Sequence, residues 1–558
     1  MKNTKAHIVV IFLAVAALYG WTLHYPFVFD DTHTIVQNPY ITSLGYIKEY
    51  FVRTAENASK IHHGSFRPLW YLSFAVNYAS GGLDPAGYRI FNIAVHAINS
   101  VLVYLIAAEL FGRRSGYGFP AAAFSGLVFA LHPLQTESVT YIVGRSGSLA
   151  ALFCLAGLLA YIRFSGRTRA AAVFFFFCMA LMSKENAVAF PLLLLLYETT
   201  SEREPRRYGL AASMLGLSGA FTAFRFYIAG LEKGPVISRS IPEHWMSEAY
   251  VIPQYLRKVF LPFGLDSDYD IRVITSAADP NFYVSAALIL VLLYSLVMLY
   301  RYNRLACFLA SWFFVMLIPE TAMPIADLMA DHRTYMPLAG IALLAGYAFT
   351  WFNLPACATG RCPRHRTAAL AACIMLAAFA GTAAARNSVY SSDRAFWEDA
   401  AAKSPGKARP FDSLGRIEYF SGNKEKAEDL LKKSIALDPK GSDAVYNLSC
   451  LLTETGRLDE ALEYNRLASA MNPDDPIFLE GIADIYSRKG LIKEADAAFQ
   501  KAIAAQPDLA ATYTEYGKFL VASRRYAEAV KILNEAVALA PSDDEARAAL
   551  TEAKNGSR

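Results

Sequence analysis

The chain has 558 residues, 54% of them hydrophobic and 13% aromatic, and a formal net charge of +4 at pH 7. That length is too great for one domain, and that apolar content is too high for a wholly soluble protein. Because Arg and Lys lie beside apolar segments and not along one soluble face, the charge pattern does not indicate a nucleic-acid-binding protein.

Up to about residue 385 the sequence consists of apolar runs separated by short polar connections. Eleven of them reach or approach the length of a membrane-spanning helix: 7–23, 90–111, 119–133, 141–162, 168–183, 186–198, 208–229, 282–300, 304–319, 333–352 and 367–385. The first run is not followed by a small-residue cleavage site, so it is predicted to be a retained anchor. A twelfth stretch, near 249–263, is interrupted by Pro253, Arg257, Lys258 and Pro262, and its crossing is left open.

Basic residues favour one arrangement of these stretches. If the stretch 249–263 lies in the interface, every connection on one side carries Lys or Arg: Lys2 and Lys5; Arg113 and Arg114; Arg163 and Arg167; Arg203, Arg206 and Arg207; Arg301 and Arg304; Arg361, Arg364 and Arg366. Eleven crossings then place the N-terminus in the cytoplasm. The first outer loop (24–89), the outer loop 230–280 and the C-terminal half lie outside it, beyond the plasma or inner membrane if the source is prokaryotic.

The polar half contains a repeat. Prolines recur every 34 residues, at Pro405, Pro439, Pro473, Pro507 and Pro541, and small residues such as Ala427, Ala461, Ala495 and Ala529 share one offset upstream of the last four. This pattern predicts paired antiparallel helices of the tetratricopeptide type, with a concave groove for a protein or peptide; a spacer or oligomerisation module is the alternative. The predicted domains are therefore a membrane domain (1–385), a linker with a partial repeat (386–407), and four full repeats with a capping helix (408–558).

Two adjacent carboxylates, Asp30 and Asp31, follow the first apolar run in the sequence Phe27-Val28-Phe29-Asp30-Asp31. Paired acids where a helix leaves the bilayer do not help to anchor it. One Asp would be enough to cap the next helix, so the pair points to a base that takes a proton from a hydroxyl at the membrane surface. The sequence does not distinguish which of the two is the base.

Further charged residues lie at the same predicted boundary. They occur in His132-Pro133 through Glu137 to Gly144-Arg145, in Ser183-Lys184-Glu185, and in Asp331-His332-Arg333-Thr334-Tyr335. Taken singly, His132 is typical of an interfacial residue, and Lys184 and Glu185 are typical of helix ends. Together, the cations could hold a lipid phosphate and the carboxylates could serve a hydroxyl acceptor. No Walker loop, dinucleotide fingerprint or nucleophilic-serine motif indicates another chemistry.

With these motifs, the chain resembles the transmembrane and tetratricopeptide-repeat (TMTC) O-mannosyltransferases, within the GT-C class of polyprenol-phosphate-dependent glycosyltransferases. The matching segments are Phe29-Asp30-Asp31, Asn38-Pro39-Tyr40-Ile41, Arg67-Pro68-Leu69, His132 to Arg145, Leu261-Pro262 to Asp268-Tyr269, Ser183-Lys184-Glu185 and Arg333-Thr334-Tyr335. The resemblance implies an all-α fold, a polytopic GT-C-like domain followed by an α-solenoid.

The resemblance also implies an activity. Asp30 or Asp31 would activate a Ser or Thr hydroxyl of an extracytoplasmic protein held by the repeats, and the sugar would leave a dolichyl or undecaprenyl phosphate by a single inverting displacement. The other residues expected at the lipid phosphate or sugar are His132, Glu137, Arg145, Lys184, Glu185, His332 and Arg333. No metal or other cofactor is expected, since the lipid-linked sugar is a co-substrate.

Three alternatives stay open. The acceptor could be a lipid or cell-wall polymer, the chain could be a non-catalytic membrane scaffold whose repeats recruit partners, and the sugar could be a hexose other than mannose. A transporter is disfavoured, because the ionisable residues cluster at one boundary and not at the midplane.

Overall fold

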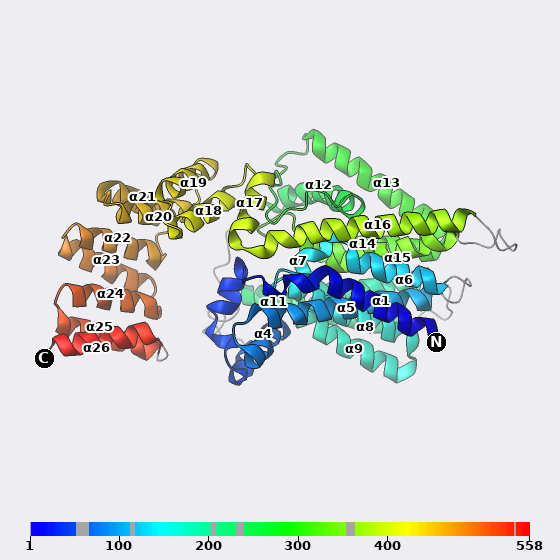
Figure 1. Cartoon of the computed structure of the whole chain (residues 1–558), viewed down its shortest axis with the longest axis horizontal. Helices are drawn as coiled ribbons and strands as arrows, with labels where there is room; N and C mark the ends of the chain where they lie inside the picture. Colours follow the sequence, from blue (N-terminus) through cyan, green and yellow to red (C-terminus); the bar gives the residue numbers. More distant parts are fainter. Residues whose placement is uncertain are drawn as a thin grey trace. The chain divides into compact units, whose positions relative to one another are not determined.

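The computed structural model of the chain describes residues 2–51, 66–111, 118–201, 208–229, 239–352, 363–540 and 543–557. These residues are helical or irregular and contain no β-strand, so the prediction of an all-α fold is confirmed for them. The chain divides into two compact units, Met1–Asp399 and Ala400–Arg558 (Figure 1). The basic connections predicted around residues 113, 206 and 361, together with Pro541, lie outside the described residues.

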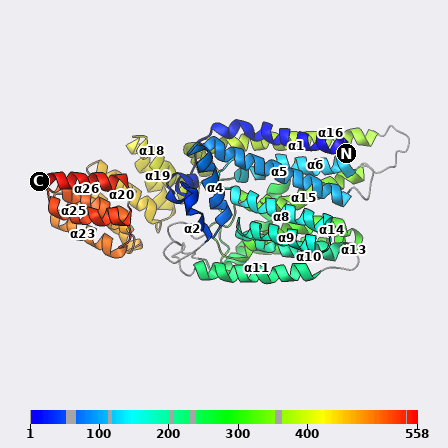
Figure 2. The same ribbon diagram turned by 90° about the horizontal axis from the view of Figure 1, so that it is seen from below.

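Each predicted apolar stretch overlaps a helix of the first unit. The helices are α1 (Lys2–Tyr19), α5 (Pro85–Phe111), α6 (Gly118–Leu131), α8 (Arg145–Arg163), α9 (Gly166–Leu181), α10 (Phe190–Thr200), α11 (Tyr208–Ala229), α13 (Pro280–Tyr302), α14 (Arg304–Ala322), α15 (Tyr335–Phe352) and α16 (Pro363–Asn387). They run side by side as one bundle, which Figure 2 shows from a second direction.

Six of the described segments are long and apolar enough to cross a membrane: Thr4–His24, Pro85–Phe111, Arg145–Arg163, Pro280–Tyr302, Arg304–Ala322 and Thr367–Ser391. Shorter helices such as α10, with 11 residues, fall below the roughly 20 residues that a span needs. The first unit is thus a multi-pass helical membrane domain, and the number of eleven crossings stays a prediction.

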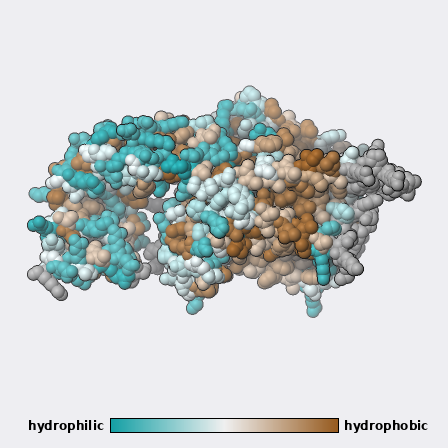
Figure 3. Space-filling model, viewed as in Figure 1, coloured by the Kyte–Doolittle hydropathy of each residue, from teal (hydrophilic) through white to brown (hydrophobic). Residues whose placement is uncertain are grey.

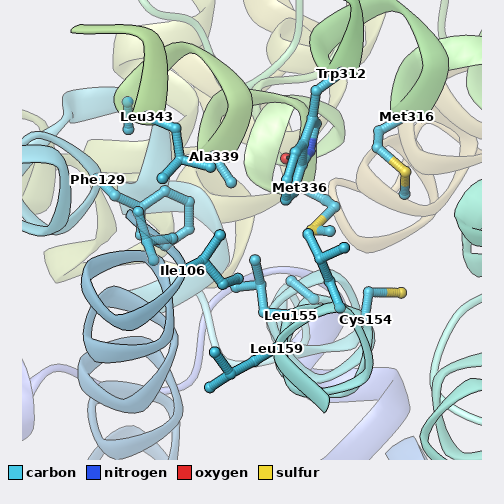
Figure 4. Packing of buried hydrophobic residues seen from close by; sticks show 14 of the residues in the cluster. Ile106, Phe129, Cys154, Leu155, Leu159, Trp312, Met316, Met336, Ala339 and Leu343 are labelled. Atoms are coloured by element: carbon cyan, nitrogen blue, oxygen red, sulfur yellow. The ribbon is translucent and has the colours of Figure 1, made fainter. Parts of the chain in front are cut away.

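The core of this domain is built where helices approach closely. Trp312 of α14 donates its indole N–H to the Met336 carbonyl of α15 (3.1 Å) and belongs to the same hydrophobic cluster as Leu155 of α8 (Figure 4). A Cβ on Gly346 of α15 would lie 2.6 Å from the Ala121 backbone carbonyl of α6 and would also meet the Ser125 hydroxyl, so this crossing requires glycine. By contrast, only 6% of the apolar window of α13 is buried. Such exposed apolar surface is stable in lipid, and the visible face of the domain is largely hydrophobic in Figure 3.

The twelfth stretch forms part of an amphipathic helix, α12 (Ile241–Phe260), which starts with a capping box between Ser240 and Glu243. Near its start, Trp245 donates its indole N–H to the Ala322 carbonyl at the end of α14 (3.2 Å). Near its end, the Val259 carbonyl contacts His132, just after α6 (2.9 Å). Because α12 joins the C-terminal ends of two bundle helices, it lies across one end of the bundle.

Short elements gather at this same end of the bundle, away from the N-terminus of α1 (Figure 1). They are η1 (Gly20–His24), η2 (Thr32–Val36), η3 (Pro39–Ile41), η4 (Leu44–Tyr46), α2 (Ile47–Phe51), α4 (Pro68–Gly81), η5 (Pro133–Gln135), α7 (Thr136–Val139), η6 (Glu185–Ala189), η7 (Asp331–Thr334) and η8 (Ser388–Ser391). They carry most of the residues that the sequence singled out.

The second unit is an array of helix pairs. Its helices are α18 (Ala408–Phe420), α19 (Lys424–Leu437), α20 (Ser442–Glu454), α21 (Leu458–Met471), α22 (Pro476–Arg488), α23 (Ile492–Ala505), α24 (Ala510–Ala522), α25 (Tyr526–Leu539) and α26 (Asp544–Gly556). Ala427, Ala461, Ala495 and Ala529 are all fully buried. Small side chains at these positions let the paired helices approach, as the 34-residue period predicts.

The division between the units falls later than the composition change at residue 385. Asn387 donates to the Leu18 carbonyl (3.0 Å) and accepts from the Thr140 hydroxyl (2.6 Å), and Tyr390 is fully buried. Residues 386–399 therefore pack in the membrane unit, and α17 (Asp393–Lys403) continues from it into the second unit.

Candidate active site

Asp31 is a fully buried carboxylate that joins two loops. Its two oxygens accept hydrogen bonds from the backbone N–H groups of Val28 (Oδ2, 3.0 Å) and Val143 (Oδ1, 3.0 Å). Burial raises the pKa of Asp31 to about 7, although these two N–H groups and Arg89 act against the rise. Asp31 is thus placed to hold the outer loop against residues 140–143, and solvent does not reach it.

Asp30 is placed differently. Its side chain is half-buried, and its backbone N–H donates to the Tyr141 hydroxyl (3.1 Å), which also hydrogen-bonds its carboxylate. The two adjacent acids therefore point into unlike surroundings. Of the pair, Asp30 is the one with exposed surface.

Glu137 and His332 form a carboxylate–imidazole pair. One Glu137 oxygen contacts His332 Nδ1 (2.7 Å), and the other accepts from the His332 backbone N–H (2.8 Å). Burial would raise the pKa of the Glu137 carboxyl, but the contact with His332 outweighs it and the pKa is lowered. An ionised Glu137 would orient the partly exposed imidazole of His332 and leave its Nε2 edge for another partner.

Asp331 links η7 to the last turn of α16. It accepts from the Tyr269 hydroxyl (2.7 Å), and Arg386 lies 3.8 Å from its other oxygen. Arg386 also donates to Asp399 (2.7 Å). Burial raises the pKa of Asp331 to about 7, despite the opposing charge of Arg386. Sequence analysis did not single out Arg386, although a charge at the end of an apolar run requires a partner.

A cluster of cations and carboxylates lies around η6. Lys184 Nζ is 3.0 Å and Arg333 Nε 3.6 Å from the Glu320 carboxylate. Arg67 donates to both oxygens of Glu185 (2.9 and 2.6 Å), and Arg225 lies 3.9 Å from it. We call Lys184, Arg333, Arg67, Arg225, Glu185 and Glu320 the cation cluster. Its four cations exceed its two carboxylates, so it can attract an anion.

The surroundings of the cation cluster support that charge balance. Burial would raise the pKa of Glu185, but Arg67 overcomes it and the pKa is lowered, so this carboxylate stays ionised. Nearby, burial raises the pKa of Glu248 to about 8, which leaves this acid mostly neutral at pH 7. Arg225, within an apolar run, and Glu320, directly after one, were missed from sequence.

Two of the predicted substrate-binding residues lie elsewhere. Arg145 has no exposed surface; its guanidinium donates to Ser73 (3.1 Å), Asn77 (2.7 Å) and the Tyr88 carbonyl (2.9 Å). His132 is also buried, and its ring nitrogens contact the Val259 carbonyl and the Leu134 N–H. Both side chains hold the protein together, so we assign neither of them to the lipid phosphate or sugar.

Among the described residues, no group of three or more His, Cys, Asp or Glu side chains is arranged to hold a metal ion. The second unit offers a different feature, a cavity of about 500 Å³ on its own surface. Its lining includes Tyr446, Glu454, Glu480, Asp484, Glu515 and Phe519, from α20, α22 and α24. The paired helices thus enclose a groove that carries both aromatic and acidic side chains.

Comparisons with known proteins match both parts of the chain. The tetratricopeptide repeat family matches residues 421–485, 479–509 and 510–543. A stretch of 149 residues is 38% identical to protein O-mannosyl-transferase TMTC4 of Homo sapiens, covering 25% of this chain and 20% of that protein. Another of 153 residues is 37% identical to protein O-mannosyl-transferase Tmtc1 of Drosophila melanogaster, covering 26% and 16%.

One match is longer. Protein O-mannosyl-transferase F38B6.6 of Caenorhabditis elegans is 22% identical over 431 residues, which cover 74% of this chain and 60% of that protein. The chain is thus similar to the TMTC proteins and contains tetratricopeptide repeats. The matches span about a fifth of the length of the first two relatives and three fifths of the third.

Proposed function

We propose that this TMTC-like chain is a glycosyltransferase that moves a sugar, mannose or another hexose, from a polyprenyl phosphate to Ser or Thr hydroxyls of extracytoplasmic proteins. The N-terminus would be cytoplasmic, and the acid pair and the repeats would face the other side. The observation that carries the proposal is the unequal acid pair: Asp31 is buried on two backbone N–H groups, whereas Asp30 is accessible.

In the proposed reaction, Asp30 accepts the proton of the acceptor hydroxyl as that oxygen attacks the anomeric carbon. The bond between this carbon and the phosphate oxygen breaks, and the polyprenyl phosphate leaves with the bonding electrons. A single displacement inverts the anomeric configuration. Asp31 takes no part in proton transfer, because both of its oxygens are occupied by N–H groups inside the protein.

The cation cluster is the proposed site for the donor phosphate. Lys184 would hold the phosphate as charge develops on the leaving group, with Arg67 and Arg225 adding to the field. Arg333 donates to the Leu328 and Asp327 carbonyls (3.0 and 2.7 Å), so its proposed part is to hold Glu320 and to add positive charge. Glu185 and Glu320 keep these cations in place through the ion pairs described above. His332, oriented by Glu137, is proposed to contact the sugar or phosphate from η7.

The groove of the repeats is the proposed acceptor site. The relatives are named as protein O-mannosyl-transferases, which supports a protein acceptor, and an extended peptide is the ligand that repeat grooves commonly take. A lipid or polymer acceptor would not need this groove. Deleting residues 404–558 distinguishes a protein acceptor from a lipid or polymer acceptor, since this deletion spares the residues that pack in the membrane unit. Transfer to protein should be lost, and unimpaired transfer to the natural acceptor would favour the alternative.

The experiment that tests the function uses cells with and without the gene. Mass spectrometry of extracytoplasmic proteins should reveal a hexose on Ser or Thr that disappears with the chain. Purified full-length protein in nanodiscs should then transfer mannose from dolichyl or undecaprenyl phosphate mannose to a Ser/Thr peptide. Identical glycoproteomes from the two strains, together with no transfer in vitro, would refute the proposal.

A further inference from the structure

The backbone around the acid pair is held by three side chains in succession. The N–H of Val28 donates to Asp31, that of Phe29 to the Asp393 carboxylate (2.7 Å), and that of Asp30 to the Tyr141 hydroxyl. Asp393 is 364 residues away in the chain from Phe29. One of the three bonds therefore depends on a residue from the start of the polar half.

Phe29 has a backbone φ of +51°, in the left-handed region. Such a conformation is rare for a bulky residue and persists only where the surroundings enforce it. Here the Phe29 ring stacks on Phe396 (centroids 5.7 Å apart, planes at 29°) and meets the edge of Trp397 (4.8 Å, 80°). The contacts and the N–H bond together fix the residue immediately before Asp30.

All three contacts come from the first two turns of α17. Ser392, just before this helix, already accepts the N–H of Ala395 (3.1 Å), as a capping residue does. The Asp393 carboxylate is thereby left to bind Phe29 across the chain. The cluster of Asp393, Phe396 and Trp397 is called the α17 clamp below.

We propose that the α17 clamp positions the acid pair. By holding Phe29 in the left-handed conformation, it turns the Asp31 carboxylate inward and keeps Asp30 at the surface, where a hydroxyl can reach it. Asp393 is a positioning residue and does not touch substrate. The catalytic half of this inference rests on the proposed function, whereas the structural half stands on the contacts alone.

The test compares Asp393→Ala with Asp393→Asn in the full-length protein. Alanine removes the acceptor for the Phe29 N–H, whereas the asparagine oxygen can still accept it. In Asp393→Ala we expect amide hydrogen exchange at Phe29 to accelerate at least tenfold, and kcat for sugar transfer to fall about tenfold or more with little change in the donor KM. Asp393→Asn should stay within about threefold of wild type in both measurements. Trp397→Leu gives a second, milder loosening of the clamp.

Glu398→Ala is the matched control, because Glu398 lies on the same helix with 56% of its side chain exposed. The positioning role would be overturned if amide exchange at Phe29 or kcat were unchanged in Asp393→Ala. It would also be overturned if Asp393→Asn changed both measurements as much as Asp393→Ala does. If wild-type protein transfers no sugar, the proposed function fails by itself. Exchange at Phe29 then decides the structural half: acceleration in Asp393→Ala supports the clamp, and wild-type exchange overturns it.

Discussion

Asp31 should be essential for the fold of the outer loop, in contrast to its neighbour Asp30. Asp31→Ala removes the acceptor of two buried N–H groups, those of Val28 and Val143. Each buried donor left without a partner costs about 1–3 kcal/mol, so the expected loss is about 2–6 kcal/mol. Asp31→Asn keeps one acceptor oxygen, and its loss should be about half as large.

The assay is the apparent unfolding temperature of purified protein in detergent, at one heating rate because membrane proteins often unfold irreversibly. The expected order of stability is wild type and Asp30→Asn, then Asp31→Asn, then Asp31→Ala. An Asp31→Ala protein as stable as Asp30→Asn would refute the assignment of Asp31 to the fold.

The same comparison has a pH dependence. Because burial raises the pKa of Asp31 to about 7 from an ordinary 3.8, the folded protein binds a proton that the unfolded chain releases between these values. The stability contributed by the protonated carboxyl is fully present at low pH and is lost as the pH rises through 7. Asparagine does not titrate, so the gap between wild type and Asp31→Asn should be wider at pH 5 than at pH 8.

Three further predictions follow from other parts of the membrane unit. Burial raises the pKa of Glu248 to about 8, so wild type should lose stability between pH 5 and pH 8; Glu248→Gln should lose less, and equal unfolding profiles for the two would contradict this. Lys184→Met should raise the donor KM about tenfold or more in a transfer assay, whereas Lys48→Met, at an exposed lysine, should leave the donor KM unchanged. Gly346→Ala should cost about 1–3 kcal/mol in thermal unfolding because its Cβ meets the Ala121 carbonyl and Ser125, while Gly216→Ala, with open space around it, should not destabilise the protein.

The fold could be predicted largely from one-dimensional patterns. Long apolar runs demand helices in lipid, and each expected run overlaps a helix. The 34-residue period predicts paired helices, because small residues such as Ala427 and Ala461 must be buried at every repeat. The position of α12 across the end of the bundle was harder to predict. An interrupted apolar run is compatible both with a membrane crossing and with a helix that lies across the bundle end.

The site could be predicted only in part. Sequence places Arg145 and Lys184 at the same boundary, but it does not tell that Arg145 points into Ser73 and Asn77. Nor does it tell which of two adjacent acids turns inward; that depends on the N–H of Val143, more than 100 residues away. Asp393 was missed for the same reason, because its bond to Phe29 joins distant parts of the chain.

The most direct test of the account is sugar transfer by Asp30→Asn in purified full-length protein, with Asp84→Asn, an exposed acid of the same outer region, as control. Removing the proposed base should lower kcat by about 10²- to 10⁴-fold while the protein keeps its unfolding temperature, and the control should match wild type. Transfer at the wild-type rate by Asp30→Asn would contradict the central claim.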